Sequence, residues 1–239
     1  MIYCIGDIHG QKAMLDAALE RVAKDGGVDA PIVFLGDYLD RGPDSRAVLQ
    51  TLIDGVEAGH NWTVLKGNHD RYLVRFLDDP YFRDPNTRDR LGWLDARIGG
   101  RKTLASYGVD ASEERDNAAI GADALKAVPQ AHVDFINARP LMHVTDDLIC
   151  VHAGIRPGIA LDDQVEDDLI WIRQPFLDDP RDHGRLVVHG HTVLEAPQHY
   201  GNRVNLDGGA AYGRPLTAAV FEGRDCWVLT DAGRVRLTP

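Results

Sequence analysis

The chain has 239 residues, with 44% hydrophobic and 26% charged residues, so it is long enough to bury the core of one soluble domain spanning residues 1–239. Its longest apolar runs, such as residues 31–35 and 186–188, are far shorter than the ~18 residues of a membrane helix and argue against a membrane protein. The formal net charge of −11 argues against nucleic acid as a partner, although a locally positive site can still bind a phosphate.

The three cysteines, Cys4, Cys150 and Cys226, each lie in an apolar, strand-like run, and no two have the spacing of metal ligands. We therefore expect buried free thiols. The first motif begins at Gly6, which leaves no room for a signal peptide before it. Both observations predict a protein of the reducing cytoplasm.

The first third of the chain alternates strands and helices. We predict strands at residues 2–5, 31–35 and 62–65, and helices at 11–24, from Asp44 or Ser45 onward, and near Asn68. This order is typical of parallel strands joined by crossover helices. In such sheets, ligand crevices form just beyond the carboxyl ends of the strands.

The segment 78–128 is polar, rich in arginine and interrupted by proline and glycine, and we expect a helical cap insert with short helices at 91–98 and 123–128. Residues 81–102 hold six basic side chains against three acidic ones, a local charge of +3: Arg83, Arg88, Arg90, Arg97, Arg101 and Lys102 against Asp84, Asp89 and Asp95. Two interpretations remain open, a solvated loop face or a basic wall that docks anionic substrates.

Extended segments dominate after residue 140. We predict a hairpin of residues 141–144 and 148–151, and further strands at 186–188, 203–206, 216–221 and 226–229, with a turn at 223–225 between the last two. The acidic cluster at 162–168 has no calcium-loop pattern and is interpreted as the start of a solvated helix.

Metal-binding side chains occur in five short motifs next to predicted strands, at residues 6–10, 36–42, 67–70, 151–154 and 189–192. Gly6, Gly36 and Gly67 are expected to let the chain leave a strand sharply. The motifs supply six candidate ligands: Asp7, His9, Asp37, Asn68, His152 and His191. This oxygen and imidazole set suits two divalent cations rather than one structural zinc ion. Two cations held ~3.5–4 Å apart activate water for attack on phosphorus.

These motifs resemble GDxHG, GDxxDRG and GNH followed by Asp or Glu, the three core motifs of the phosphoprotein phosphatase family of calcineurin-like metallophosphoesterases. The similarity is greatest to the small bacterial and phage serine/threonine phosphatases. It implies an α/β fold in which two mixed sheets form a β-sandwich flanked by helices, with the metals at one end. The resemblance also implies that Asp7 and His9 hold one metal, that Asp37 bridges both, and that the second is held by Asn68, His152 and His191. Manganese is favoured, with iron, zinc, nickel or magnesium as alternatives.

Catalysis also needs a proton donor and fixed positive charge. His69 follows the ligand Asn68 and is the candidate donor, and Asp40 is placed by its motif to orient it. Arg41 and, by resemblance, Arg173 are the candidate phosphate-binding residues. His189 is interpreted as support for a neighbouring ligand. No role is expected for the remaining histidines, His60, His132, His143, His183 and His199, whereas Tyr38 and residues 208–212 are pocket-lining candidates by analogy alone.

We therefore predict a metal-dependent phosphomonoester hydrolase, in which activated water attacks directly and the substrate is phosphoserine or phosphothreonine in a protein. One alternative is a symmetrical diadenosine tetraphosphate hydrolase or a small-molecule phosphatase of the same superfamily. Arg41-Gly42-Pro43 and the GNHD form suit the dinucleotide branch, whereas the pair Asp40-Arg41 favours the protein phosphatases. A second alternative is a catalytically silent metal-binding scaffold, against which the intact His69 and Asp40 count. The expected partner is a phosphorylated protein or small phosphoester, with no nucleic acid and no membrane.

Overall fold

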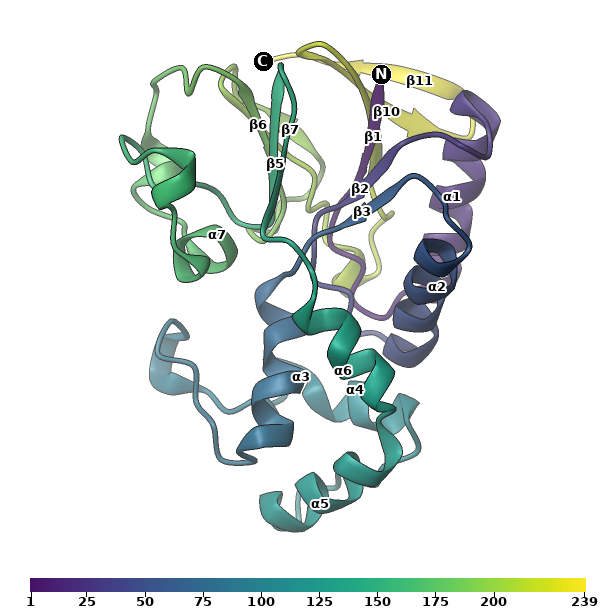
Figure 1. The fold of residues 1–239 in the computed structure, drawn as a ribbon, viewed down its shortest axis with the longest axis vertical. Coiled ribbons are helices and arrows are strands. Elements are labelled where there is room, and N and C mark those ends of the chain that lie inside the picture. The colour runs from purple at the N-terminus through teal and green to yellow at the C-terminus, as the bar shows by residue number, and fades with distance from the viewer.

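The computed structural model describes residues 1–239, except for the side chain of Arg88. Two mixed sheets lie face to face in the upper half of Figure 1, and helices cover their outer faces. The predicted fold class, a β-sandwich of two mixed sheets flanked by helices, is confirmed. Both chain termini lie at the end of the sheets that is farthest from the lower lobe.

The first sheet has the order β11-β10-β9-β1-β2-β3. Its parallel half consists of β1 (Ile2–Ile5), β2 (Ile32–Phe34) and β3 (Trp62–Val64), joined by α1 (Lys12–Gly26) and α2 (Ser45–Glu57). The predicted alternation of strands and helices is therefore confirmed. Asp44 caps α2 as expected, because its carboxylate accepts the backbone N–H of Ala47 at 3.2 Å. Three antiparallel strands complete the sheet: β9 (Ala218–Glu222), β10 (Asp225–Thr230) and β11 (Gly233–Leu237).

The second sheet has the order β4-β5-β6-β8-β7. The predicted hairpin is present as β4 (Met142–Val144) and β5 (Leu148–Val151), followed by β6 (Leu186–His189), β7 (Gln198–His199) and β8 (Arg203–Asn205). Strands β5, β6 and β8 run parallel, so their carboxyl ends point the same way. The acidic cluster leads into α7 (Glu166–Trp171), which has three carboxylates in its first turn. There they interact favourably with the positive end of the helix dipole.

The apolar core between the sheets holds the three cysteines, and all three are free and buried, as predicted. The Sγ atoms of Cys4 and Cys150 lie 3.8 Å apart, so these thiols join the packing of the two sheets. A larger cluster packs the outer face of the first sheet against α1 and α2. Among the described residues, no helix combines the length and the apolar character needed to cross a bilayer.

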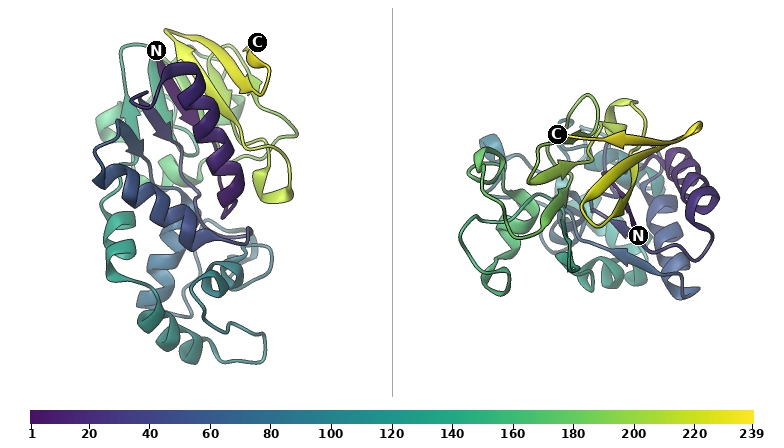
Figure 2. Two further views of the ribbon diagram at one scale, coloured as in Figure 1. Left: turned by 90° about the vertical axis from the view of Figure 1, so that its right-hand side faces the viewer. Right: turned by 90° about the horizontal axis from the view of Figure 1, so that it is seen from above.

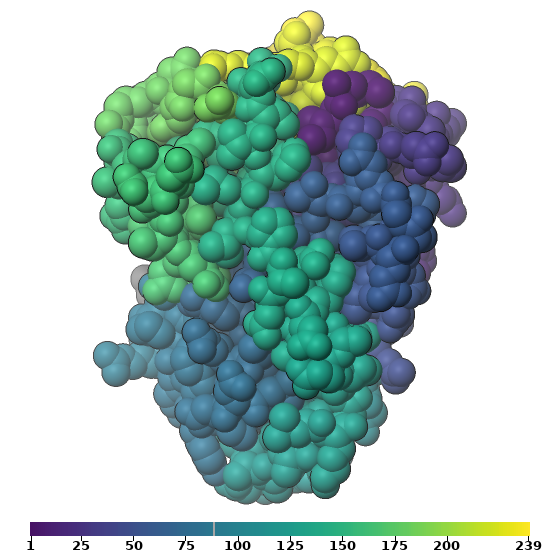
Figure 3. Space-filling view, viewed as in Figure 1, coloured from purple at the N-terminus to yellow at the C-terminus, as the bar shows by residue number. Residues whose placement is uncertain are grey.

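The lower lobe of Figures 1 and 3 lies between β3 and β4 in the sequence. It begins with α3 (Asn68–Asp78), and we call residues 79–137 the cap. The cap contains α4 (Gly100–Ser106), α5 (Asn117–Ala127) and α6 (Gln130–Asn137). Short 3₁₀ helices lie at Arg88–Arg90, Leu161–Asp163, Phe176–Asp178 and Ala210–Tyr212.

The helix predicted at 91–98 is wrong, because this segment makes successive turns between Gly92 and Gly99. Gly99 has a φ of 98°, which breaks a right-handed helix, and α4 starts only after it. The helix predicted at 123–128 begins earlier, where the Asp116 side chain caps it by accepting the backbone N–H of Ala118 at 2.9 Å.

Candidate active site

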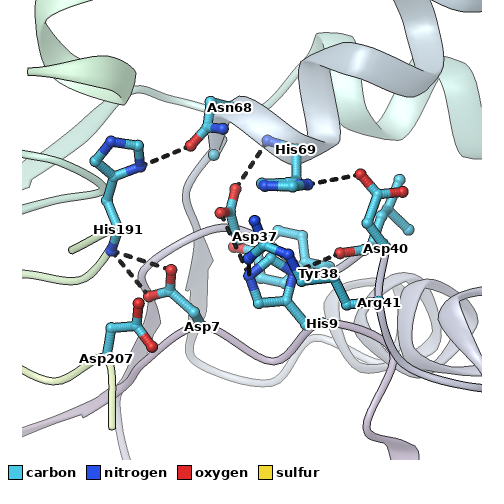
Figure 4. A network of polar contacts seen from close by, with 12 residues as sticks. Asp7, His9, Asp37, Tyr38, Asp40, Arg41, Asn68, His69, His191 and Asp207 are labelled. Carbon is cyan, nitrogen blue, oxygen red and sulfur yellow. Dashed lines mark hydrogen bonds and ion pairs between the residues drawn. The ribbon is translucent and has the colours of Figure 1, made fainter. Parts of the chain in front are cut away.

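The six predicted ligands are buried and lie together where the strands of both sheets end, and Figure 4 labels all of them except His152. Asn68 Oδ1 is 2.9 Å from His152 Nε2 and 2.8 Å from His191 Nδ1. Asp37 Oδ1 is 3.4 Å from His152 Nε2, and Asp37 Oδ2 is 3.7 Å from His9 Nε2. The last of the six, Asp7, accepts the backbone N–H of His191 at 3.0 Å. Motifs that are far apart in the sequence therefore form one cluster.

Several site residues have a strained backbone. Positive φ angles occur at His9 (48°), Asp37 (57°), Asp40 (71°), Arg41 (65°) and His191 (62°). Such angles are unfavourable for residues with a Cβ atom and persist only where the surrounding structure enforces them. Strain of this kind concentrates at functional sites, which supports a role for the whole cluster.

The glycines beside the ligands serve two purposes. Gly36 has a φ of 99°, so it makes the sharp turn that the sequence predicts. Gly67 instead has a φ of −100°, which any residue can adopt, so backbone freedom does not explain the glycine at this position. A Cβ atom on Gly67 would lie 2.2 Å from Asp37 Oδ1, so this glycine lets the third motif approach the central carboxylate.

Two groups of side chains are close enough to hold a metal ion, and they share Asp37. One combines Asp37 with His152 and His191, and the other combines it with His9 and His69; within each group all ligand atoms lie within 4.8 Å of one another. A shared carboxylate is the expected arrangement for a pair of neighbouring cations. Asp7 stands outside both groups, whereas His69, the predicted proton donor, is inside one of them.

The surroundings of His152 fit a cation. Its Nδ1–H donates to the Leu35 carbonyl oxygen at 2.8 Å, so the lone pair is on Nε2. Nε2 faces two oxygen atoms, Asn68 Oδ1 and Asp37 Oδ1, which also offer lone pairs. Burial lowers the pKa of His152 to about 4, so Nε2 keeps its lone pair at neutral pH. A divalent cation would satisfy all three. His191 Nε2 adds to this fit, because it is buried and has no hydrogen-bond partner among the described residues.

The imidazole of His9 has the same tautomer as that of His152. Its Nδ1–H donates to the Leu39 carbonyl oxygen at 2.7 Å, and its Nε2 accepts a hydrogen bond from Arg41 Nη1 at 2.9 Å. Arg41 therefore occupies the lone pair that a metal would need. This contact and a metal at His9 Nε2 exclude each other, so the guanidinium would be available to a phosphate when a metal is bound.

His69 and Asp40 form a buried pair in which Nδ1 lies 2.6 Å from Asp40 Oδ2. Two residues of the cap complete the shell of Asp40: Trp93 Nε1–H donates to both carboxylate oxygens at 2.9 Å, and Thr103 Oγ1–H donates to Oδ1 at 2.7 Å. Burial raises the pKa of Asp40 to about 7 and lowers the pKa of His69 well below its usual range. Asp40 fixes His69 Nδ1, which leaves Nε2 as the atom that can exchange a proton with a substrate.

Sequence reasoning missed two further buried carboxylates. Asp70 accepts the backbone N–H groups of Gly67, Asp37 and Tyr38 at 2.8–2.9 Å and so ties the second motif to the third. Asp207 lies beside Asp7 (Figure 4), and burial raises its pKa. Asp207 follows β8, which contains Arg203 and Asn205, and it precedes Gly208, so it lacks the apolar run and the preceding glycine that mark Asp7 and Asp37.

The cluster opens into a cleft of about 220 Å³, which is lined by Asp37, Asn68, His69 and His191 together with both predicted phosphate-binding residues, Arg41 and Arg173. Trp171 and Ile98 also line it. We call this the reaction cleft. The prediction for Tyr38 is wrong, because its ring is buried in the core and its hydroxyl donates to the Leu65 carbonyl oxygen at 2.5 Å.

A second cleft, of about 520 Å³, lies between the cap and the loop after β8. We call it the cap cleft, and its lining residues are Arg41, Asp95, Ala96, Arg97, Gly99, Arg101, Lys102, Ala211 and Tyr212. Of residues 208–212, Ala211 and Tyr212 line the cap cleft rather than the reaction cleft. His189 is buried against Phe176, with 5.2 Å between the ring centroids, and it belongs to neither group of candidate metal ligands.

The basic segment 81–102 divides into paired and unpaired charges. Arg97 binds Asp95 (Nε–Oδ1, 2.9 Å), and Arg101 donates to backbone carbonyl groups, including those of Leu94 and Ser112 at 2.9 Å. Lys102 is exposed and makes no ion pair with another described residue. The side chain of Arg88 lies outside the described part of the structure. Of the basic residues of this segment that line the cap cleft, Lys102 is therefore the one that is not already engaged by another described residue.

Comparisons with known proteins agree with this geometry. A family model described as calcineurin-like phosphoesterase matches residues 1–218. The asymmetrical bis(5'-nucleosyl)-tetraphosphatase PrpE of Anoxybacillus flavithermus is 30% identical over 245 residues, covering 91% of this chain and 89% of the relative. The symmetrical bis(5'-nucleosyl)-tetraphosphatase of Paracidovorax citrulli is 31% identical over 169 residues, covering 69% of this chain and 48% of the relative.

Two solved structures share the fold. One, named a "putative diadenosine tetraphosphatase", has a TM-score of 0.64 at 22% identity and covers 99% of this chain and 93% of its own. The other, a cold-active protein-tyrosine phosphatase of a psychrophilic Shewanella, has a TM-score of 0.63 at 16% identity and covers 99% of this chain and 80% of its own.

Proposed function

Because the chain belongs to the calcineurin-like phosphoesterase family, we propose that it is a two-metal hydrolase whose substrates are dinucleoside polyphosphates. The reaction class is supported by the two ligand groups that share Asp37 in a cleft also lined by Arg41 and Arg173. The substrate class rests on one observation, the tetraphosphatase of Anoxybacillus flavithermus that matches this chain over nine-tenths of its length. The serine/threonine phosphatase predicted from the sequence becomes the second candidate.

The metal-holding residues in this proposal are Asp7, His9, Asp37, Asn68, His152 and His191. When bound, two divalent cations lower the pKa of a water molecule and offset the negative charge of the phosphoryl oxygens. Asp37 is the shared ligand, since it belongs to both groups. Asp70 and the backbone of His69 hold Asp37 in place through hydrogen bonds of 2.9 Å.

The chain's other residues bind and orient the substrate. Arg41 and Arg173 offer planar guanidinium groups from the lining of the reaction cleft, and these suit the oxygens of a phosphoryl group. His69 Nε2 can give a proton to the leaving oxygen when the His69–Asp40 pair holds one proton more than the neutral imidazole, and the raised pKa of Asp40, about 7, allows the pair to hold it. In a dinucleoside polyphosphate the leaving oxygen belongs to a phosphate, which needs less protonation than an alkoxide.

The serine/threonine phosphatase remains a candidate because of the His69–Asp40 pair. A serine or threonine alkoxide is a poor leaving group and depends on a proton donor. The contact of 2.6 Å between Nδ1 and Oδ2 is buried, and Trp93 and Thr103 hold the carboxylate. Such a positioned proton donor matters more for an alkoxide leaving group than for the phosphate leaving group of a dinucleoside polyphosphate. Manganese is the metal proposed for the test of either function.

The test compares three substrates side by side on purified protein reconstituted with manganese: diadenosine tetraphosphate, a phosphothreonine peptide and p-nitrophenyl phosphate. We expect kcat/KM to be highest for diadenosine tetraphosphate. Chromatography of the products then separates symmetrical cleavage to two ADP from asymmetrical cleavage to ATP and AMP. A higher kcat/KM for the phosphopeptide would transfer the proposal to the protein phosphatase, and inactivity on all three would contradict both.

A further inference from the structure

We propose that the cap cleft is a nucleoside-binding subsite, in which Tyr212 stacks on the base while Arg41 and Lys102 hold the phosphates that lead to the reaction cleft. This inference rests on the proposed function, because it names where the substrate's nucleoside lies. Three features support it. They are the contact of Arg41 with the cap at Gly99, the exposed ring of Tyr212, and the exposed cation of Lys102.

The two clefts are neighbours. Arg41 lines both of them, and the consecutive residues Ile98 and Gly99 line the reaction cleft and the cap cleft respectively. The boundary between the clefts is tightly packed. Arg41 N–H donates to the Gly99 carbonyl oxygen at 3.4 Å, and a Cβ atom on Gly99 would lie 2.6 Å from Arg41 N. Because the Arg41 side chain lines both clefts, a chain of phosphates that passes the guanidinium would lead from the reaction cleft into the cap cleft.

Their sizes suggest different occupants. The reaction cleft, at about 220 Å³, is smaller than the roughly 300–1,000 Å³ typical of pockets for drug-sized ligands and suits a phosphoryl group. The cap cleft, at about 520 Å³, lies well within that range and has room for a base with its ribose. A substrate with a nucleoside beyond its phosphates would use both volumes.

Tyr212 is presented as a stacking surface. It is 60% exposed, although it lies on a short 3₁₀ helix (Ala210–Tyr212) whose ends are fixed by Gly209 and Gly213 at φ angles of 84° and 82°. The loop that carries it reaches down towards the cap in the left view of Figure 2. The Arg41 guanidinium carbon lies 5.8 Å from the centroid of the Tyr212 ring. An exposed aromatic ring beside a cation is a common platform for a nucleobase.

The charge of the cap cleft suits phosphates, but only some of its cations are free. Arg97 neutralises Asp95 and Arg101 holds the cap backbone, as described above. Lys102, on α4, has no such partner among the described residues and is exposed. Arg41 and Lys102 are therefore the cations that a polyphosphate can recruit without breaking an ion pair or a side-chain hydrogen bond within the cap.

The test measures inhibition of p-nitrophenyl phosphate hydrolysis by ADP and by pyrophosphate, which differ by one nucleoside. If the base stacks on Tyr212, the wild type should bind ADP about tenfold more tightly than pyrophosphate, the scale of one base–aromatic stack. Tyr212→Ala should remove most of this preference, and Tyr212→Phe should keep it. Lys102→Ala should weaken ADP inhibition a few-fold, and the effect should fade at high salt because an exposed charge is screened.

Matched controls are Tyr81→Ala and Lys126→Ala, which remove an equally exposed ring and an exposed cation elsewhere on the cap. Equal inhibition by ADP and pyrophosphate in the wild type would overturn the subsite, as would an unchanged preference in Tyr212→Ala. This readout does not need turnover of a dinucleotide. A preference for ADP that depends on Tyr212, found together with no hydrolysis of diadenosine tetraphosphate, would reject the proposed function and leave the nucleoside subsite standing.

Discussion

The strand ends and the cap both contribute to the candidate active site, but they do so through different kinds of contact. At the strand ends, each motif supplies its own groups over a few residues, as in Asp37 and Asp40 on one loop. The cap contributes through contacts across long sequence separations: Trp93 and Thr103 bind the Asp40 carboxylate from 53 and 63 residues away. We infer that the strand ends carry the chemistry, whereas the cap holds the proton donor's partner and receives the rest of the substrate.

The largest effect is expected at the residue that both metal-binding groups share. Asp37→Asn removes the shared carboxylate charge and should reduce kcat/KM by at least about a hundredfold, since even indirect partners of a ligand cost 10–100-fold. Elemental analysis should show that both metals are lost. Retention of one tightly bound metal with substantial activity would contradict the sharing of Asp37.

The second largest effect distinguishes two possible roles of His69, proton donor and metal ligand. His69→Asn should lower kcat for an alkyl phosphomonoester by about 10²–10⁴-fold, the usual contribution of general acid catalysis. The loss should be much smaller for p-nitrophenyl phosphate and dinucleoside polyphosphates, which have better leaving groups. Equal losses for all substrates, accompanied by a lower metal content, would instead make His69 a ligand of the His9–Asp37 group.

A smaller effect tests whether the cap assists the chemistry. Trp93→Phe keeps the buried ring but removes the N–H that donates to both Asp40 oxygens. We expect kcat for an alkyl phosphomonoester to fall by about tenfold and the free energy of unfolding to fall by about 1–3 kcal/mol, the range for a lost hydrogen bond to a charged group. Trp62→Phe, in β3, is the matched control. Equal effects of the two substitutions on kcat would remove the cap from catalysis.

The smallest effect concerns pH and stability after chelation of the metals. Burial raises the pKa of Asp40 and Asp70 to about 7, above an unfolded value of about 4, so their contribution to stability is lost as the pH rises through about 7. The buried histidines have lowered pKa values, and their opposite contribution is complete only when the unfolded histidines are deprotonated, above about pH 7.5. Burial also raises the pKa of Asp37 to about 8, so between about pH 7.5 and 9 the melting temperature of the chelated protein should fall.

The manganese-loaded protein should lose less stability over the same pH range, because the cations favour ionised carboxylates. Melting curves at several pH values, recorded with chelator and with manganese, measure the difference. The same slope for both samples would show that the buried carboxylates are not coupled to metal binding.

The sequence predicts the strand-end half well because the signal there is local. An apolar run that ends in a glycine or histidine beside a metal-binding side chain marks both the element and its functional residue. Asp207 lies outside the five motifs of this kind, because it follows the polar strand β8 and has its glycines on its carboxyl side. The two strands that were missed are weak for physical reasons: β7 has two residues, and β11 alternates exposed arginines with apolar residues at the sheet edge.

The cap was predicted poorly because its determinants are not local. Gly92 and Gly99 convert the expected helix at 91–98 into turns, and the short helices α4 and α6 lie outside the predicted ranges. Nothing in the local pattern marks Trp93 or Thr103 as partners of Asp40, because only the folded chain brings them together. The charge count of the basic segment also misleads, since Arg97 and Arg101 are already engaged within the cap.

The account depends most directly on two cations that share Asp37, so the decisive measurement is anomalous diffraction from crystals of the manganese-loaded wild type. We predict two anomalous peaks, one on each side of the Asp37 carboxylate, with His152 and His191 at one and His9 at the other. Elemental analysis should give two manganese ions per chain. A single peak, or a pair of peaks that leaves Asp37 uncoordinated, would contradict the account.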